Sequence, residues 1–432
     1  MKRKLWEKIL LIGALLGLVG GTLAGCGGQT SPTAENGGPV VLHTLYMNQA
    51  GYTDKVLEDM AAEFHKQNPD ITVEFSFVPY DSLHDKIVTS ASSPTATYDV
   101  VLEDLIWSTE FAKKGYVIPL ESYINKDIDT KDIAPALFSP FEVDGHTWAM
   151  PFLANFQNFF YNAAMLKKAG FSGPPKTMDE WLNQMETLKK DGIVKYPWID
   201  SWKQEEGLVC DYVRTAGEYG ANLFDKDGNP IMNQGGALKA LEFMRKTVDL
   251  GLVDPNSLTA DEPTAMNAFI SGNAAFNTNW TFVYGKMNDP SSSKIVGQGQ
   301  VTTFPVDSGT NQPSASVSGF QGLAIMANSK HQDAAWKWIQ FATSKEIQAQ
   351  HLDEMPIWTS VQKSPEALKA NPAINVYTEN LDNVYNRPLV PDYMQVSTII
   401  QKYVHAVLAQ EMSPQAGADA MVKDIKALNN SQ

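Results

Sequence analysis

Cysteine is nearly absent from this chain, which has only Cys26 and Cys210 among its 432 residues. At most one disulfide is therefore possible. Arginine is scarce and the formal net charge is −15, so the chain lacks the basic face that nucleic-acid binding requires. The seven histidines have no zinc-ligand spacing, and neither a Gly-x-Ser-x-Gly elbow nor a glycine-rich phosphate loop occurs. These absences predict that the protein has no catalytic residues, metal or cofactor. They also predict that it does not bind nucleic acid.

An apolar run lies near the start of the chain, at residues 9–20, and is shorter than the ~20 residues of a membrane-spanning helix. It follows the basic residues Lys2, Arg3 and Lys4 and precedes the stretch LAGC, which is the order of a secretory signal peptide. Leu23-Ala24-Gly25-Cys26 resembles the lipobox of bacterial lipoproteins. The resemblance implies a signal peptide at residues 1–25 and acylation of Cys26. A transmembrane anchor, or a disulfide from Cys26 to Cys210, remains an alternative.

Residues 26–39 are rich in glycine and small polar residues and have no periodicity. We expect a flexible tether with a reach of about 20 Å. An acylated cysteine followed by a tether describes a domain held at the outer face of the bacterial cell membrane. The ~390 residues that follow exceed what one hydrophobic core usually supports, so two domains are expected.

The first part of the domain alternates between strand and helix patterns. The pattern predicts strand, helix, strand, helix and strand over residues 40–45, 53–67, 71–78, 82–91 and 98–104. This order is typical of a doubly wound sheet, in which ligands bind at the carboxyl ends of the strands.

Later segments carry clear local signals. Thr177 with Glu180 three residues on predicts a capping box, and Ser413-Pro414 predicts another helix start. Residues 225–230 lack the Gly and Glu positions of a calcium loop, so a turn is expected there. Trp336 and Trp338 lie at helical spacing, and at least one of them is expected in a core.

Four stretches point to one family. Residues 145–190, GHTWAMPFLANFQNFFYNAAMLKKAGFSGPPKTMDEWLNQMETLKK, resemble the segment that crosses between lobes in maltose-binding-protein-like solute receptors. Residues 266–287 resemble that family's helix, Ser-Gly turn, strand and Trp-bearing helix start. Residues 318–344 resemble its return strand and Trp-containing helix, and residues 387–428 its closing helix pair. The chain is identified on these motifs as a member of the family, in its lipoprotein form.

The resemblance implies an α/β, two-lobed periplasmic-binding-protein-like fold, in which each lobe is a doubly wound sheet flanked by helices. Three hinge crossings would lie near residues 153–155, 317–320 and 354–357. The N-terminal lobe would comprise residues 40–153 plus 320–356, and the C-terminal lobe residues 154–319 plus 357–432. Closure around a ligand is recognised in this family by the permease of an ABC importer. A monomeric extracytoplasmic receptor for a carbohydrate, with permease subunits as its partners, is therefore implied.

A sugar receptor needs flat aromatic rings for the C–H faces and carboxylates or amides for the hydroxyls. Trp280 matches the family's ligand-stacking tryptophan, with a core tryptophan as the alternative. Asn155 stands where the maltose receptor has a carboxylate, and the receptor's second tryptophan has no counterpart near Tyr393. Both differences argue against maltose itself.

The other candidates follow strand ends or crossings. Asn48 and Gln49 follow the first strand, and one or two of Glu103, Asp104 and Trp107 after the third strand are expected to touch ligand. The remaining candidates for the cleft are Asp200, Trp202, Phe320, Gln321, Trp358 and Tyr393.

Two other classes of function remain open. The same scaffold could hold a polyamine, which would require several acids in the cleft, or a phosphate ester or iron chelate. Anionic ligands are disfavoured because arginine is scarce. A secreted glycosidase or a sugar sensor is the third possibility, and hydrolysis would need two carboxyl groups ~5–10 Å apart across one cleft.

Overall fold

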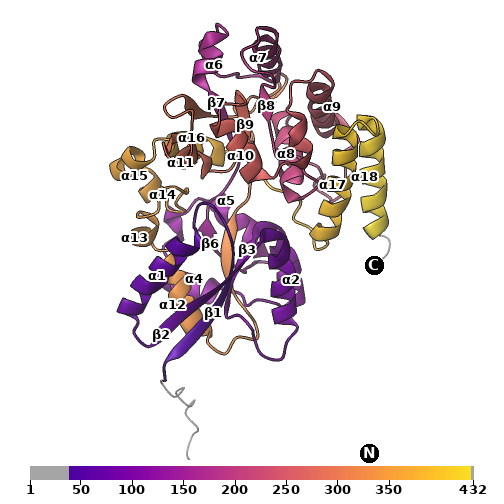
Figure 1. Ribbon diagram of the computed structural model, residues 1–432. Helices are drawn as coiled ribbons and strands as arrows, with labels where there is room; N and C mark the ends of the chain where they lie inside the picture. Colours follow the sequence, from indigo (N-terminus) through magenta and orange to yellow (C-terminus); the bar gives the residue numbers. More distant parts are fainter. Residues whose placement is uncertain (1–37, 430–432) are drawn as a thin grey trace, which may run out of the picture. The chain divides into compact units, whose positions relative to one another are not determined.

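Two β-sheets organise the chain. The computed structural model describes residues 38–429, and the residues from Pro39 onward form a compact unit. A five-stranded sheet is the centre of one lobe and a four-stranded sheet the centre of the other (Figure 1). The predicted signal peptide, residues 1–25, and Cys26 lie outside the described residues, as does nearly all of the tether.

The first lobe is built on a mixed sheet whose strands, in spatial order, are β2 (Ile71–Val78), β1 (Val40–Met47), β3 (Val100–Asp104), β12 (Gln321–Ile325) and β6 (Met150–Leu153). Strand β1 runs parallel to β2 and to β3, whereas β12 is antiparallel to both of its neighbours. The carboxyl ends of the three parallel strands therefore meet at one edge of the sheet.

Helices cover this first sheet, and two of them match the helices predicted over residues 53–67 and 82–91. The covering helices are α1 (Asp54–Gln67), α2 (Tyr80–Ala91), α3 (Ser108–Lys114), α4 (Glu121–Asp127), α5 (Pro135–Phe138), α12 (Gln332–Ala342) and α13 (Lys345–Gln348). Helix α1 begins because the Thr53 hydroxyl accepts from the Val56 N–H at 3.4 Å, and it buries Leu57, Met60 and Phe64. Figure 1 shows α1 and α12 on one side of the sheet and α2 on the other.

The second lobe has a smaller sheet, with strands in the order β10 (Gly299–Thr302), β7 (Asn158–Asn162), β9 (Phe276–Asn279) and β8 (Trp198–Ile199). Strand β9 pairs antiparallel with β7 and parallel with β8. Strand β9 ends at Asn279, so the polypeptide that follows, beginning with Trp280, leaves the sheet at its edge.

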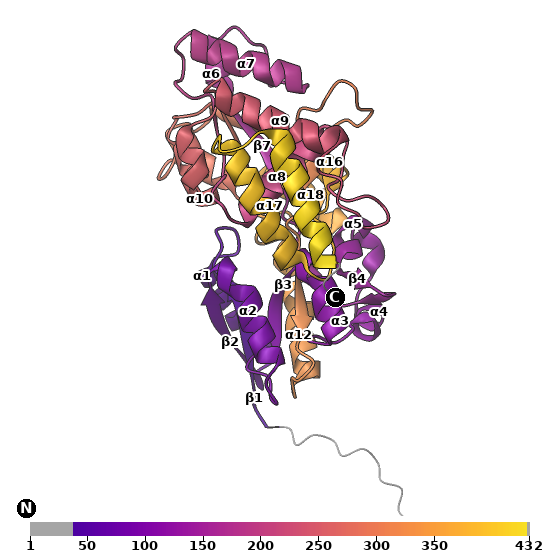
Figure 2. The same cartoon turned by 90° about the vertical axis from the view of Figure 1, so that its right-hand side faces the viewer.

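The second lobe has more helices than strands. They are α6 (Ala163–Lys168), α7 (Met178–Lys190), α8 (Glu206–Glu218), α9 (Gly235–Asp249), α10 (Glu262–Ile270), α11 (Val283–Asn288), α17 (Tyr393–Leu408) and α18 (Pro414–Asn429). The predicted cap of α7 is confirmed, since the Thr177 hydroxyl accepts from the Glu180 N–H at 3.2 Å. Helix α18 starts at Pro414 as expected. Helices α17 and α18 pack side by side next to α8 and α9 (Figure 2).

Short elements complete the fold. Strands β4 (Glu142–Val143) and β5 (His146–Thr147) form a hairpin, and β11 (Ser316–Val317) pairs with β13 (Val384–Tyr385). Helices α14 (Thr359–Gln362), α15 (Pro365–Ala370) and α16 (Ile374–Leu381) follow α13. Four single 3₁₀ turns are η1 (Leu105–Trp107), η2 (Thr130–Asp132), η3 (Ser139–Phe141) and η4 (Pro255–Thr259).

The chain passes from the first sheet to the second between β6 and β7. It returns to the first sheet at β12, after β11, whose Val317 is buried in the second-lobe core. The expected lobe boundary after residue 356 differs from the packing. Ile357, Trp358 and Ile374 are buried with the first-lobe core, because the Trp358 indole N–H donates to the main-chain oxygen of Thr343 at the end of α12. Helix α16 also reaches the second lobe, where the Tyr377 hydroxyl donates to the main-chain oxygen of Thr281.

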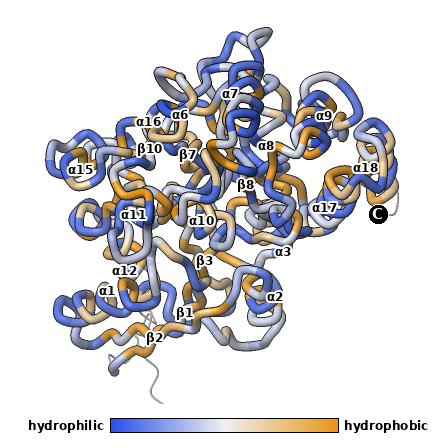
Figure 3. Tube along the Cα trace, turned by 45° about the horizontal axis from the view of Figure 1, so that its top comes forward, coloured by the Kyte–Doolittle hydropathy of each residue, from blue (hydrophilic) through white to orange (hydrophobic). Residues whose placement is uncertain are grey.

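Each lobe has its own hydrophobic core. Figure 3 shows hydrophobic stretches of chain at the interior strands and hydrophilic stretches at the periphery. Trp336 and Trp338 are both buried in the first core, where at least one was expected, and Cys210 is buried in the second. Within residues 38–429, none of the helices combines the length and apolar character needed to span a bilayer.

Candidate functional site

A cleft of about 440 Å³ is lined by both lobes, a volume in the range of small-molecule sites. The first lobe contributes Asn48, Gln49, Tyr80, Asp81, Asp104 and Gln321. The second lobe contributes Lys203, Glu205, Glu206, Asp261, Glu262 and Trp280. The cleft therefore combines an aromatic wall with amide and carboxylate groups.

The strand topology explains why the first-lobe residues converge. Asn48 follows β1, Tyr80 follows β2, and Asp104 is the last residue of β3. Because these strands are parallel, their carboxyl ends deliver all three residues to the same edge, where ligands of such sheets bind. Gln321, the first residue of antiparallel β12, pairs with Asp104 and so lies at the same edge.

Helix starts bring in the second-lobe residues. Helix α8 begins at Glu206 and α10 begins at Glu262, after Asp261, whose carboxylate accepts from the Thr264 N–H at 2.9 Å. Trp280 comes directly after β9, and its main-chain N–H donates to the Asn279 side chain at 2.9 Å. Its indole N–H lies 3.4 Å from a carboxylate oxygen of Glu262.

The Trp280 ring lies against the backbone at Gly319. A Cβ at Gly319 would come within 2.7 Å of the ring carbon Cζ3, closer than two carbons can approach without displacement. The side chain of Trp280 is partly buried, so the crossing at Gly319 supports one edge of the ring while another part faces the cleft.

Arg387 connects the lobes at the base of the cleft. Its guanidinium donates to Asp104 at 2.6 Å and to Glu206 at 2.9 Å, and only 2% of the residue is exposed. The Tyr80 hydroxyl donates to the other Asp104 oxygen at 2.8 Å, and the Tyr393 hydroxyl donates to Glu206. Burial raises the pKa of Glu206, and Arg387 opposes that rise.

A second polar chain joins the lobes through Thr281. Its hydroxyl lies 2.9 Å from the Asn155 amide oxygen and is also bonded to the Glu354 carboxyl. One hydroxyl has a single proton to donate, so the arrangement is satisfied when Glu354 is protonated and donates to Thr281. Burial raises the pKa of Glu354 to about 7, which agrees with a shared proton at this point.

The structure brings part of the predicted site together. Trp280, Asn155, Asp104, Asn48, Gln49 and Gln321 line the cleft. Two predicted ligand contacts near Asp104 do not line the cleft. Glu103 is fully buried and accepts from the Ser108 hydroxyl, and Trp107 is 1% exposed with its ring centre 5.6 Å from that of Tyr80.

The other predicted residues are packed in the cores and do not line the cleft. Trp202 is fully buried, with its ring edge-on to Trp198 at 5.0 Å. Asp200 is fully buried 3.5 Å from the Arg214 guanidinium. Phe320 and Trp358 belong to the first-lobe core, and Tyr393 reaches the site only through its hydrogen bond to Glu206.

Sequence reasoning missed several lining residues, namely Tyr80, Glu206, Glu262, Glu354 and Arg387. Arg387 itself was a usable signal, because it is one of few arginines in the chain and precedes the apolar stretch PLVP. Asp261-Glu262-Pro263 has the composition of a helix start and could have located Glu262 at the beginning of a helix.

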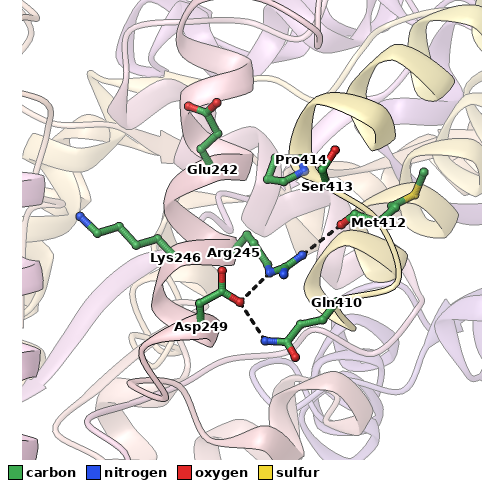
Figure 4. A pocket seen from close by; sticks show the side chains of 8 residues that line it. All are labelled: Glu242, Arg245, Lys246, Asp249, Gln410, Met412, Ser413 and Pro414. Carbon is green, nitrogen blue, oxygen red and sulfur yellow. Dashed lines mark hydrogen bonds and ion pairs between the residues drawn. The ribbon is translucent and has the colours of Figure 1, made fainter.

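A second cavity lies on the second lobe between α9 and the turn that joins α17 to α18 (Figure 4). Arg245 donates to Asp249 at 2.8 Å and to the main-chain oxygen of Met412 at 3.0 Å, and Gln410 donates to Asp249 at 2.8 Å. Arg245, Asp249 and Gln410 thus pair with one another and with the main chain of the turn. None of the described residues that line it is aromatic, so we assign it a role in joining these helices.

Metal chemistry has no support among the described residues. In that part of the chain, no three histidine, cysteine or carboxylate side chains gather in a way that could hold a metal ion.

Solved structures of similar proteins share this architecture. The maltose-bound MalE3 of T. maritima aligns with a TM-score of 0.83 and 26% identity, covering 90% of this chain and 99% of its own. A solute-binding protein of an ABC transporter from Agrobacterium radiobacter, in complex with ribitol, aligns with a TM-score of 0.81 and 25% identity, covering 91% and 100%. The two-lobed periplasmic-binding-protein-like fold is thereby confirmed.

Sequence comparison agrees with the structural likeness. The "Probable ABC transporter-binding protein" of Deinococcus radiodurans is 26% identical over 331 residues, which cover 73% of this chain and 76% of that protein. Residues 50–349 match the family model described as bacterial extracellular solute-binding protein. With the two lobes, the cleft between them and a match over more than half of its length, the chain belongs to the family of bacterial extracellular solute-binding proteins.

Proposed function

We propose that this protein is a monomeric, lipid-anchored receptor that captures a mono- or oligosaccharide between its lobes and delivers it to the permease of an ABC importer. The observation that carries the proposal is the partly buried Trp280 ring on the wall of a cleft that amides and carboxylates also line. A pyranose presents apolar C–H faces and a rim of hydroxyls, which such a surface complements. The maltose held by MalE3 of T. maritima is built of such rings, and the ribitol held by the Agrobacterium radiobacter protein is an open-chain polyol that presents the same hydroxyl groups.

We infer that Trp280, Asn155, Asp104, Asn48, Gln49 and Gln321 contact the solute. In this proposal Trp280 stacks on a sugar face and the amides exchange hydrogen bonds with hydroxyls. Glu103, Trp107, Asp200, Trp202, Phe320, Trp358 and Tyr393 support the site from the cores that hold the strand ends and helix starts.

The N-terminal region supports the anchoring. Residues 1–25 have the order of a signal peptide, and Leu23-Ala24-Gly25-Cys26 has the lipobox pattern. Acylation at Cys26, followed by a tether of residues 26–39, would keep the receptor close to its permease. An importer needs its receptor outside the membrane and near it.

A polyamine is the second candidate solute, because carboxylates line the cleft from both lobes. A polyamine presents flexible methylene chains and ammonium groups without a rim of hydroxyls. The amides of Asn48, Gln49 and Asn155 would then have fewer partners. The aromatic wall and the amides together favour the sugar.

A thermal-shift screen of the full-length protein tests the proposal. Mono- and oligosaccharides and polyols are compared with spermidine and with peptides. A specific sugar should raise the melting temperature by mass action, and Trp280→Ala should abolish the shift while leaving the ligand-free melting temperature nearly unchanged. A clear shift with spermidine or peptides and none with any sugar would contradict the proposal.

Membrane fractionation tests the anchor. Cys26→Ala should move the protein from the membrane to the soluble fraction without altering the sugar-induced thermal shift. Cys210→Ala, a change at the buried thiol of α8, is the matched control and should leave the protein at the membrane. Equal membrane retention of both variants would contradict acylation at Cys26.

A further inference from the structure

The cleft carries many more carboxylates than cations. Asp81, Asp104 and Glu354 line it from the first lobe, and Glu205, Glu206, Asp261 and Glu262 from the second. The cations that line it are Lys203 and Arg387. Both are already engaged, since Arg387 bridges Asp104 and Glu206 and the Lys203 ammonium lies 2.6 Å from Glu205. The charges of Asp81 and Asp261 also favour the charged form of Lys203, but two cations are fewer than the seven carboxyl groups that line the cleft.

Glu262 receives little support from hydrogen-bond donors. Asp261 caps α10 and Glu354 is bonded to Thr281, whereas the side-chain donor near Glu262 is the Trp280 indole at the long distance of 3.4 Å. Glu262 also lies directly over the start of α8, where a Cβ at Gly207 would be 2.8 Å from its carboxylate oxygen. Burial raises the pKa of Glu262 to about 7, and the charges of Glu205 and Asp261 add to that rise.

Gln321 gives an independent sign of the ligand's chemistry. It lines the cleft, is 5% exposed, and its amide oxygen has no hydrogen-bond donor among the described residues. A buried acceptor left without a donor costs stability, so a bound solute should supply an N–H or O–H at this point. The cleft thus offers acceptors from two separate elements, α10 and β12, beside one unpaired donor, the side-chain N–H of Gln49.

We propose that the sugar held in this cleft bears a protonated amino group, which binds the Glu262 carboxylate beside the Trp280 ring. A hydroxyl is both donor and acceptor, but an ammonium has three donors and no acceptor. It therefore matches a surface rich in acceptors. An ammonium beside tryptophan also gains a cation–π contact. This inference rests on the proposed sugar-capture function and names the substrate class within it.

Matched sugars test the inference on the full-length protein. The members of each set differ only in the substituent at C2 of each sugar ring, which is hydroxyl, ammonium or acetamide. The sets are glucose, glucosamine and N-acetylglucosamine, the galactose and mannose counterparts, and cellobiose, deacetylated chitobiose and chitobiose. Spermidine is a sugar-free amine control. In at least one set, the amino member should bind at least ten times more tightly than the hydroxyl and acetamide members in calorimetric titration.

A charge-removing variant locates the contact. Glu262→Gln keeps the shape of the side chain and should lower the ratio of amino-sugar affinity to matched neutral-sugar affinity at least tenfold. Glu186→Gln, on the exposed face of α7, removes the same charge outside the cleft and should change neither affinity. An equal loss for amino and neutral sugars in Glu262→Gln would overturn the assigned role of Glu262.

The outcomes separate the two proposals. If the neutral member binds as tightly as the amino member, or more tightly, in every set that binds, the amino-sugar inference is overturned. The proposed capture of a sugar is not contradicted by that result. Binding of spermidine with no binding of any sugar overturns both. Absence of any binding across all sets and controls also overturns both.

Discussion

Arg387 and Asp104 are joined across the base of the cleft by a hydrogen bond of 2.6 Å between guanidinium and carboxylate. Asp104 ends a strand of the first lobe, and Arg387 also binds Glu206 at the first turn of α8 in the second lobe. One nearly buried side chain thus links the ligand-binding edge of one sheet to the start of a helix in the other lobe. The contact can persist only while the lobes are close together.

Replacing Arg387 by methionine should destabilise this conformation strongly. Asp104 and Glu206 would remain buried without their cation, and loss of one partner of a buried ion pair costs about 3–5 kcal/mol. Urea unfolding without ligand measures the loss. Arg245→Met is the control, because Arg245 pairs with a half-exposed Asp249 and should cost about 1 kcal/mol. Equal losses in the two variants would contradict the interlobe role of Arg387.

Gly319→Ala should weaken sugar binding. The new methyl group would lie 2.7 Å from the Trp280 ring and would push the ring out of position at a cost of about 1–3 kcal/mol, which corresponds to about tenfold or more in affinity. Isothermal titration with the sugar found in the screen measures the effect. Gly173→Ala, where a Cβ meets nothing within 4 Å, should bind normally. Unchanged affinity in Gly319→Ala would show that the position of Trp280 does not matter for binding.

Trp202 and Trp280 should respond in opposite ways to truncation. Trp202 is fully buried against Trp198, so Trp202→Ala should cost about 3–5 kcal/mol of stability. Trp280→Ala should cost much less stability and remove sugar binding. Chemical unfolding and titration on both variants separate the two roles. Retained binding in Trp280→Ala would move the site away from this ring.

Glu354 should make stability depend on pH. Its pKa rises from 4.5 to about 7 in the folded protein, so the folded state holds an extra proton between these values and stability decreases as pH rises through that range. Below about pH 4.5 both states are protonated and the penalty is absent. The negative charge of the neighbouring Asp353 also raises the pKa of Glu354. The charge of Glu354 in turn raises the pKa of Tyr52.

Thermal unfolding of Glu354→Gln from pH 5 to pH 8 checks this sign. Because the amide does not ionise, the melting temperature of the variant relative to the natural protein should increase as pH rises. Glu58→Gln, at an exposed position of α1, should run parallel to the natural protein at every pH. A constant difference for Glu354→Gln would mean that the carboxyl keeps its ordinary pKa in the fold.

The lobe framework was largely predictable because its signals are local. The strand over residues 71–78 has the predicted bounds, and α7 begins directly after the predicted cap Thr177. Helix α2 begins at Tyr80, two residues before the predicted start at 82. The prediction missed this start because Pro79 and Tyr80 do not have a standard capping pattern. The lobe boundary near residue 356 was harder to predict, since it depends on which core receives Ile357 and Trp358.

The site was predictable only in part, because sequence gives the side chain but not the direction in which tertiary packing turns it. Trp202 and Trp280 both follow short strands of the second sheet, yet one packs on Trp198 and the other faces the cleft. Glu103 and Asp104 are adjacent, and strand alternation sends only Asp104 to Arg387. Glu262 and Arg387 come from segments distant in the chain, so their meeting at the cleft follows from the fold.

Hydrogen–deuterium exchange with and without the sugar that gives the largest thermal shift tests the central claim most directly. A sugar held between the lobes should slow exchange both at residues 48–51 of the first lobe and at the starts of α8 and α10 in the second, and Trp280→Ala should remove both effects. Protection confined to one lobe, or protection at the cavity between α9 and α18, would contradict capture in the interlobe cleft.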